Sequence, residues 1–296
     1  MLAACTLCGH RCGVDRASGV LGRCRAGAVA RVAAATLHPG EEPCLGPQAG
    51  TVFFSRCNLG CVYCQNWQIS QEGQGEDVSA EELAGMMLRL QAEGAANIEL
   101  VSPTPWVPQI VEALGVAAGR GLDLPVVYNT GGYDSPEALR LLEGVVDVYL
   151  PDMRYGWGVV ADRFSGAPDY VEVNRSAVLE MYRQVGDVEF NAQGQARRGL
   201  LIRLLVLPNG LARIGATFEW MAGHLSTATW FSLMAQYAPA HRAEEFIEIA
   251  RPVTEAEYRA LLEQADDYGF ENFYTQAPES QDALRPDFGR DRPFGD

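Results

Sequence analysis

The chain has 296 residues, of which 48% are hydrophobic and 21% are charged, values that suit one large α/β domain with appendages. Its formal net charge of −15 argues against a nucleic-acid partner, which would require a basic surface. No run approaches the roughly 18 apolar residues of a membrane span, so no membrane partner is expected. Every basic residue is an arginine, which excludes mechanisms that depend on a lysine Schiff base or a phosphate-loop lysine.

Residues 1–50 contain many Gly, Pro and Cys residues and show little hydrophobic periodicity, which predicts a small module held together by metal. Four of its thiols, Cys5, Cys8, Cys12 and Cys24, follow the spacing C-x2-C-x3-C-x11-C. Such a set suits either a closed structural zinc site or a second iron–sulfur cluster, and the spacing alone does not choose between them. Reduced thiols in a loop are the alternative without a metal.

The distribution of the cysteines also indicates the compartment. All eight lie between residues 5 and 64, whereas the disulfides of a secreted protein would be spread along the chain. We therefore expect a cytoplasmic protein whose cysteines bind metal. Cys44 is the exception, because it stands alone and is expected to be a small buried hydrophobe.

A short apolar run at residues 52–54 leads into a polar loop that carries Cys57, Cys61 and Cys64 at the spacing C-x3-C-x2-C. Three thiolates on one loop can hold three irons of a cubane 4Fe-4S cluster, which normally takes four cysteines. The fourth iron is then open to an outside ligand. Zinc is a weaker interpretation, because it needs a fourth ligand and none lies close by in the sequence. Buried thiols without a metal are the remaining alternative.

Beyond residue 50, apolar runs alternate with segments in which apolar residues recur at helical spacing. Two capping-box signatures, Ser79 with Glu82 and Thr254 with Glu257, mark the starts of helices. Strands separated by helices are typical of a parallel β/α array. We expect six strands, at residues 52–54, 97–101, 125–128, 145–150, 199–207 and 230–235.

The aromatic residue before the last cysteine, Tyr63, completes a pattern that resembles the signature of the radical S-adenosylmethionine (radical SAM) superfamily. The runs CNLGCVYCQNWQIS, Leu150-Pro151-Asp152 and SLMAQY at residues 232–237 look like one branch of it. That branch contains proteins similar to the pyruvate formate-lyase activating enzyme with an additional Cys-rich N-terminus. The resemblance extends from about residue 5 to about residue 275.

The resemblance implies a partial six-stranded parallel (β/α)6 barrel over residues 51–250. The Cys-rich module of residues 1–50 precedes it, and a C-terminal helix and extended tail over residues 251–296 follow it. The resemblance also implies that SAM chelates the open iron of the 4Fe-4S cluster through its amino and carboxylate groups. One electron, from a flavodoxin- or ferredoxin-type donor, then cleaves SAM to a 5′-deoxyadenosyl radical.

In such barrels the chemistry lies at the carboxyl ends of the strands, so the residues there are the expected SAM contacts, together with Tyr63. Ser102 and Thr104 stand where related enzymes often have Gly-Gly-Glu, which holds the SAM amino group. Asn129 and Thr130 follow the third strand, where the ribose should lie. Plain turn chemistry is the alternative for Asn129 and Thr130.

Asp152 and Arg154 follow the fourth strand and are similar to the Asp-x-Lys of the activating enzymes, in which the cation meets the SAM carboxylate. A local salt bridge between the two is the alternative, because residues two apart on an extended chain point to one side. Arg203 lies inside an apolar strand and needs a partner, either the SAM carboxylate or a polar network. Gln236 and Tyr237 could reach substrate or SAM, or else complete core packing.

The resemblance implies an enzyme that abstracts a hydrogen atom, with a glycine of a protein partner as the precedent. An incomplete barrel has a wide lateral opening, so a protein or peptide substrate is expected, with a small-molecule substrate as the alternative. A non-catalytic iron–sulfur electron carrier or metal-dependent scaffold is a further alternative, although a carrier would need four cysteines for each cluster. Pro105 and Leu204 depart from this branch, in which histidines are expected at both positions.

Overall fold

The computed structural model of the chain describes residues 1–39, 42–276, 286–290 and 293–294. All six predicted strands are present and pair with one another in parallel, which confirms the predicted α/β class. In spatial order they are β2 (Ala49–Phe54), β4 (Ile98–Val101), β5 (Val126–Thr130), β6 (Val148–Pro151), β8 (Ala196–Leu205) and β9 (Trp230–Met234).

Four further strands extend this sheet. β10 (Phe273–Thr275) adds in parallel to β9, and β7 (Glu189–Phe190) pairs antiparallel with β8. At the opposite edge β1 (Ala30–His38) lies antiparallel between β2 and β3 (Glu76–Val78). The outer strands β3 and β10 do not pair with each other in the described part of the chain, so the sheet curves without closing there.

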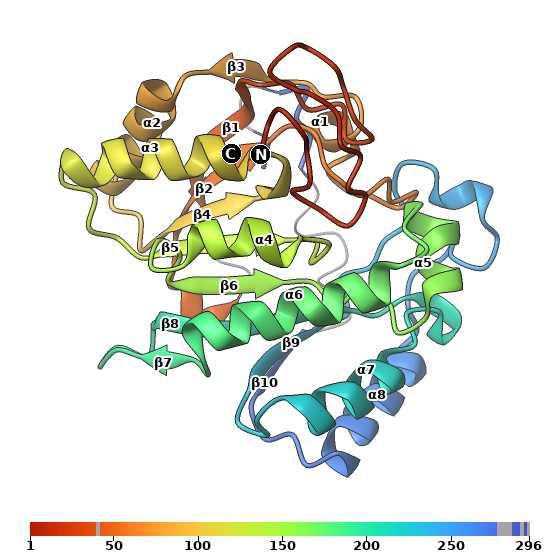
Figure 1. Cartoon of the computed structure of the whole chain (residues 1–296). Coiled ribbons are helices and arrows are strands. Elements are labelled where there is room, and N and C mark those ends of the chain that lie inside the picture. Colours follow the sequence, from red (N-terminus) through yellow and green to blue (C-terminus); the bar gives the residue numbers. More distant parts are fainter. Residues whose placement is uncertain (40–41, 277–285, 291–292, 295–296) are drawn as a thin grey trace.

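The helices lie along the outer side of the curved sheet (Figure 1). Both predicted capping boxes are formed: the Ser79 side chain accepts from the Glu82 N–H, Thr254 does the same for Glu257, and each glutamate accepts in return. The α-helices are α1 (Trp67–Ser70), α2 (Ala80–Ala92), α3 (Val107–Gly119), α4 (Pro136–Leu139), α5 (Gly158–Ser165), α6 (Tyr170–Val185), α7 (Ile214–His224) and α8 (Glu255–Asp267). The 3-10 helices are η1 (Pro43–Leu45), η2 (Thr104–Trp106), η3 (Arg140–Leu142), η4 (Pro208–Gly210) and η5 (Ala243–Glu245).

Alternation along the parallel strands separates a helix-side core from an inner face. On β8, Leu200, Ile202 and Leu204 pack into the large apolar core beneath the helices. Arg203 and Leu205 point the other way and line a cavity. The two groups separate because successive side chains of a strand point to opposite faces of the sheet.

The first 29 residues form loops that dock on the carboxyl ends of the strands. Cys8 and Asp134 form an isolated antiparallel bridge, and the Gly9 N–H donates to the Tyr133 carbonyl oxygen at 3.3 Å. Arg16 Nη1 donates to the Pro105 carbonyl oxygen at 2.7 Å, just beyond β4. The Cys-rich segment therefore covers the same end of the sheet as the cysteine loop that follows β2 (Figure 1).

The described part of the C-terminal tail packs against β2 and α1. The rings of Phe288 and Phe294 lie 5.4 and 5.3 Å from that of Phe53, and the Phe288 N–H donates to Gln68 Oε1 at 3.0 Å. The extended tail predicted for the C-terminus falls in part on residues 277–285, 291–292 and 295–296, which lie outside the described residues. Across the described ranges, no helix combines the length and apolarity needed to cross a membrane.

Candidate functional site

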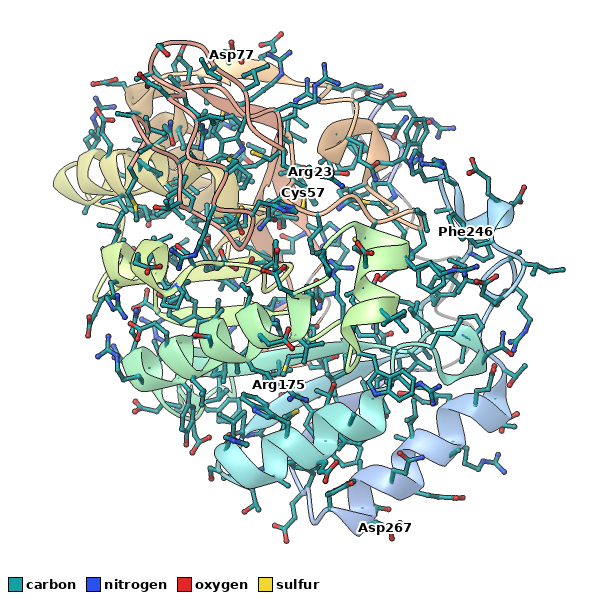
Figure 2. All side chains as sticks on the ribbon, turned by 45° about the vertical axis from the view of Figure 1, so that its right-hand side comes forward. Arg23, Cys57, Asp77, Arg175, Phe246 and Asp267 are labelled. Carbon is teal, nitrogen blue, oxygen red and sulfur yellow. The ribbon has the colours of Figure 1, made fainter. Side chains whose placement is uncertain are left out.

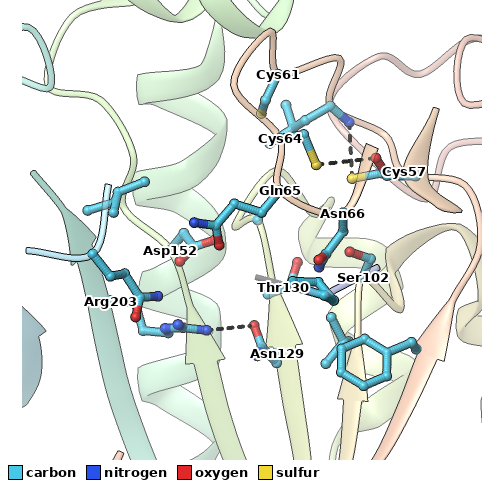
Figure 3. Close-up of a pocket in the computed structure, with 18 of the residues that line it drawn as sticks. Cys57, Cys61, Cys64, Gln65, Asn66, Ser102, Asn129, Thr130, Asp152 and Arg203 are labelled. Carbon is cyan, nitrogen blue, oxygen red and sulfur yellow. Dashed lines mark hydrogen bonds between the residues drawn. The ribbon is translucent and has the colours of Figure 1, made fainter. Parts of the chain in front are cut away.

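One cavity opens at the carboxyl ends of the parallel strands, and the loop after β2 forms its rim (Figure 3). It collects side chains from residues more than 180 positions apart in the chain, as a site built on a parallel sheet does. Of the residues predicted for the cluster and for SAM, all but one line it: Cys57, Cys61, Tyr63, Cys64, Ser102, Asn129, Thr130, Asp152, Arg154 and Arg203.

The exception is Thr104. It is 1% exposed and lies in η2, where its hydroxyl pairs with the Thr130 hydroxyl at 3.0 Å and faces the N-terminal loops. The prediction that Thr104 contacts SAM is therefore not supported by its position. Ser102 does face the cavity, and its φ of 58° turns the chain sharply at the end of β4.

Each thiol of the cysteine loop has a polar neighbour at its sulfur. The Ser165 hydroxyl donates to Cys61 Sγ at 3.0 Å, and the Leu59 N–H donates to Cys57 Sγ at 3.5 Å. Cys64 Sγ lies 3.3 Å from the Ser70 hydroxyl. Hydrogen bonds of this kind stabilise negative charge on sulfur, which suits thiolates that bind iron.

The end of α5 holds the loop in place. The Gly60 N–H donates to the Ser165 carbonyl oxygen at 3.0 Å, and the Val62 N–H donates to that of Phe164 at 2.9 Å. Tyr63 extends inward from the same loop, and its hydroxyl lies 2.6 Å from that of Tyr155. The loop is therefore fixed at both its backbone and its aromatic side chain.

Burial disfavours the ionised form of two of these thiols, Cys57 and Cys64. It raises the pKa of Cys57 to about 12 and, with a contribution from Cys61, raises the pKa of Cys64 to about 11. Without a metal both thiols are protonated at neutral pH, and binding of iron releases their protons.

Replacing Ser165 with alanine is expected to shift the reduction potential of the cluster at this loop to more negative values. The variant lacks the 3.0 Å hydrogen bond to Cys61 Sγ, which favours the more negatively charged reduced state. Ser70→Ala removes a longer contact and should give a smaller shift. An anaerobic redox titration followed by electron paramagnetic resonance (EPR) measures both, and equal potentials for Ser165→Ala and the wild type would contradict the role of this hydrogen bond.

Asp152 and Arg154 form the local salt bridge that was the alternative to a contact with SAM, with Nη2 and Oδ2 2.5 Å apart, and both face the cavity. Arg154 Nε is buried and has no hydrogen-bond partner among the described residues. A buried donor without a partner is costly, so this atom is suited to an anionic group brought by a ligand. The donors present thus fit a carboxylate beside the cysteine loop.

Arg203 belongs to a buried polar network deeper in the cavity. Its Nε lies 3.1 Å from Glu42 Oε1, and its Nη1 donates to Asn129 Oδ1 at 3.5 Å (Figure 3). Asn129 Nδ2 in turn donates to Glu99 Oε1 at 2.7 Å. Of the two partners predicted for Arg203, the polar network is therefore present within the protein itself.

The sequence interpretation did not identify Glu42 and Glu99 as members of this network. Glu99 interrupts the apolar run of β4, which is the same signal that pointed to Arg203 in β8, and it could have been found that way. Glu42 precedes η1 in a polar segment and carries no such signal. Gln236 and Tyr237, which were predicted as candidates, both line the cavity.

The four N-terminal cysteines also come together, around a second and smaller pocket. Cys5 and Cys8 are buried, Cys24 is half-buried and Cys12 is exposed. Burial raises the pKa of Cys8 to about 12 and also raises that of Cys24. Cys44 lies elsewhere and is 2% exposed, as expected for a small buried side chain.

Comparison with known proteins agrees with this geometry. The model of the radical SAM superfamily matches residues 51–152, which contain the cysteine loop and the strand ends up to Asp152. The uncharacterized protein MJ0674 of Methanocaldococcus jannaschii is 31% identical over 278 residues, which cover 91% of this chain and 76% of that protein.

Two solved structures share the fold. They are the [FeFe]-hydrogenase maturase HydG, with 12% identity over 74% of this chain, and SuiB of Streptococcus suis bound to its precursor peptide SuiA, with 14% identity over 75%. Both have a TM-score of 0.52, and the match covers 48% and 47% of their chains, so this chain spans about half the length of either. The family match and the relative from Methanocaldococcus jannaschii show that the chain belongs to the radical SAM superfamily.

Proposed function

We propose that the chain binds a 4Fe-4S cluster at Cys57, Cys61 and Cys64, binds SAM beside it, and uses the pair to abstract a hydrogen atom from a substrate. The observation that carries this proposal is that one cavity contains three thiols and the donor Arg154 Nε, which has no partner among the described residues. When bound, the cluster supplies one electron that cleaves SAM and so generates the radical that attacks the substrate.

The side chains of the cavity have distinct parts in this proposal. Arg154, oriented by Asp152, would hold the SAM carboxylate, while Ser102 and Asn129 offer polar contacts to the rest of the molecule. Glu99 belongs to the network that fixes Asn129 and would orient a polar substrate group. Tyr63 and Tyr155 close the wall behind the cysteine loop and exclude water from it.

The proposed substrate is a residue of a peptide or protein, with glycine as the precedent set by the activating enzymes. Two observations support it: the open sheet between β3 and β10, and the fold shared with SuiB, which was solved with a precursor peptide bound. Deuterium tests it. If a pool of peptides with deuterated glycine is supplied, the 5′-deoxyadenosine formed should be about 1 Da heavier. Label from a deuterated small-molecule extract, but not from peptides, would instead identify a small-molecule substrate.

Binding of SAM to the cluster has its own test. Adding SAM to the protein after anaerobic reconstitution and reduction should change the EPR spectrum, because SAM would occupy an iron that no cysteine holds. An EPR spectrum that does not change at saturating SAM would favour the electron-carrier alternative. Such a carrier would leave the donors of the cavity without a ligand.

The remaining parts of the proposal concern partners and compartment. A flavodoxin- or ferredoxin-type protein would deliver the electron, and no nucleic acid or membrane takes part. All eight cysteines are free thiols, which suits a reducing cytoplasm. The four N-terminal cysteines would form a second metal site, as zinc or as a second iron–sulfur cluster.

A further inference from the structure

We propose that Cys5, Cys8, Cys12 and Cys24 hold a second 4Fe-4S cluster, rather than zinc, and that the buried guanidinium of Arg16 is its counter-cation. This deepens the metal site proposed above for the N-terminus, and it does not depend on SAM binding or cleavage at the other cysteines.

The first observation is that the four thiols surround a pocket, which Arg16 also lines. In the described part of the chain, no three Cys, His, Asp or Glu side chains meet as the ligands of a single metal ion would. The three thiols of the cysteine loop after β2, which lies in the segment that matches the radical SAM superfamily, likewise line a cavity. A cubane distributes its thiolates over four irons, whereas zinc draws four sulfurs to one point at about 2.3 Å.

The second observation is the burial of Arg16, which is 1% exposed. Its Nε and Nη2 donate to the Gly27 carbonyl oxygen at 3.0 and 2.5 Å, and its Nη1 donates to that of Pro105. Its guanidinium lies over the Trp106 ring, 5.3 Å from the centroid. These contacts fix the position of the cation, and all of them are to neutral groups.

Among the residues that the structure describes, no carboxylate forms an ion pair with Arg16. Its Nη1 also donates to Cys5 Sγ at 4.0 Å. A buried charge without a counter-charge costs several kcal/mol. Four thiolates around a 4Fe-4S core carry a net charge of about −2, which would compensate the guanidinium.

The third observation is the position of the pocket beside the first cysteine loop. Asn58, the residue after Cys57, lines the pocket, and its carbonyl oxygen lies 2.8 Å from His10 Nε2. Arg23, which is labelled in Figure 2, also lines the pocket and is exposed, so the pocket reaches the surface. The second cluster would therefore lie between the surface and the SAM-binding cluster.

Metal analysis after anaerobic reconstitution with iron and sulfide tests this inference. The wild type should hold about eight irons per chain. The double variant Cys5→Ser/Cys24→Ser should hold about four, and so should the triple variant Cys57→Ala/Cys61→Ala/Cys64→Ala. Cys44→Ser, which removes a buried thiol outside both sets, should keep about eight. About four irons and one zinc in the purified wild type would overturn the choice of metal, and about four irons with no zinc would overturn the site.

This set of variants tests the two metal sites independently of each other. The triple variant retains only the N-terminal site, so its iron content does not depend on whether the other loop binds SAM. Far-UV circular dichroism checks that Cys5→Ser/Cys24→Ser remains folded. If it does not, the exposed Cys12→Ser variant replaces it, and it should lose part of the same iron.

The role of Arg16 is tested in the background of the triple variant, where only the N-terminal cluster can give a signal. Arg16→Met should shift its reduction potential to more negative values, because a nearby positive charge favours the reduced state. Arg16→Lys keeps the charge and should shift the reduction potential less. Arg23→Met removes an exposed cation and should also cause a smaller shift. Equal potentials for Arg16→Met and its parent would overturn the assignment of Arg16 as counter-cation.

Discussion

Replacing Glu42 with alanine is expected to lower the free energy of unfolding by about 3–5 kcal/mol, the usual cost of removing one partner from a buried ion pair. The Glu42 side chain is 1% exposed and that of Arg203 is 9% exposed, with 3.1 Å between Oε1 and Nε. The variant would leave Arg203 without this carboxylate in a cavity wall that water reaches poorly. Urea unfolding of the metal-free protein measures the change.

Two controls separate charge from packing. Glu42→Leu/Arg203→Met removes both charges and should recover most of the loss, because neither member of the pair then remains buried without the other. Glu143→Ala removes a carboxylate from an exposed pair with Arg183 and should lower the free energy of unfolding far less, because water screens that pair. A double variant as unstable as Glu42→Ala would show that the loss comes from packing.

Replacing Arg154 with methionine is expected to weaken SAM binding about 10- to 100-fold, since a hydrogen bond to a charged group contributes about 1.5–3 kcal/mol. Arg154 Nε is buried and finds no partner in the part of the chain that the structure describes, and the cation is oriented by Asp152 at 2.5 Å. Methionine keeps much of the length and none of the donors. Equilibrium dialysis of SAM against the reconstituted protein gives the affinity.

The matched control is Arg163→Met, which removes a surface arginine that pairs with Glu248 outside the cavity. It should leave SAM affinity unchanged. Unchanged affinity in Arg154→Met, with the cluster intact by its iron content, would show that another group holds the SAM carboxylate.

The sequence predicted the features that depend on local pattern. The six parallel strands and both capping boxes are present, because apolar runs and side-chain caps are encoded within a few neighbouring residues. The cysteine loop was found for the same reason, since its three thiols lie within eight residues of the chain from Cys57 to Cys64.

The features that the sequence did not predict depend on contacts between distant segments. β1 has the sequence ARVAAATLH, which is rich in alanine, so its strand state comes from pairing with β2 and β3 rather than from its own pattern. Ser165 contacts Cys61, which is 104 residues away in the sequence, and Glu42 pairs with Arg203, which is also far away in the sequence. No local pattern marks such residues as partners.

The two positions that depart from the related branch lie outside the cavity. Leu204 packs into the helix-side core, and Pro105 lies under the N-terminal loops, where its carbonyl oxygen accepts from Arg16. In this chain neither side chain lines the cavity in which SAM and substrate are proposed to bind. Differences in substrate would therefore arise from other residues, such as Glu99.

Formation of 5′-deoxyadenosine is the most direct test of the central claim. The wild type, reconstituted anaerobically with iron and sulfide and given SAM and a strong reductant, should form this product. The Cys57→Ala/Cys61→Ala/Cys64→Ala variant, which keeps the N-terminal cysteines, should form none. A wild type that carries its cluster and still forms no product, or a variant that forms as much as the wild type, would contradict the account.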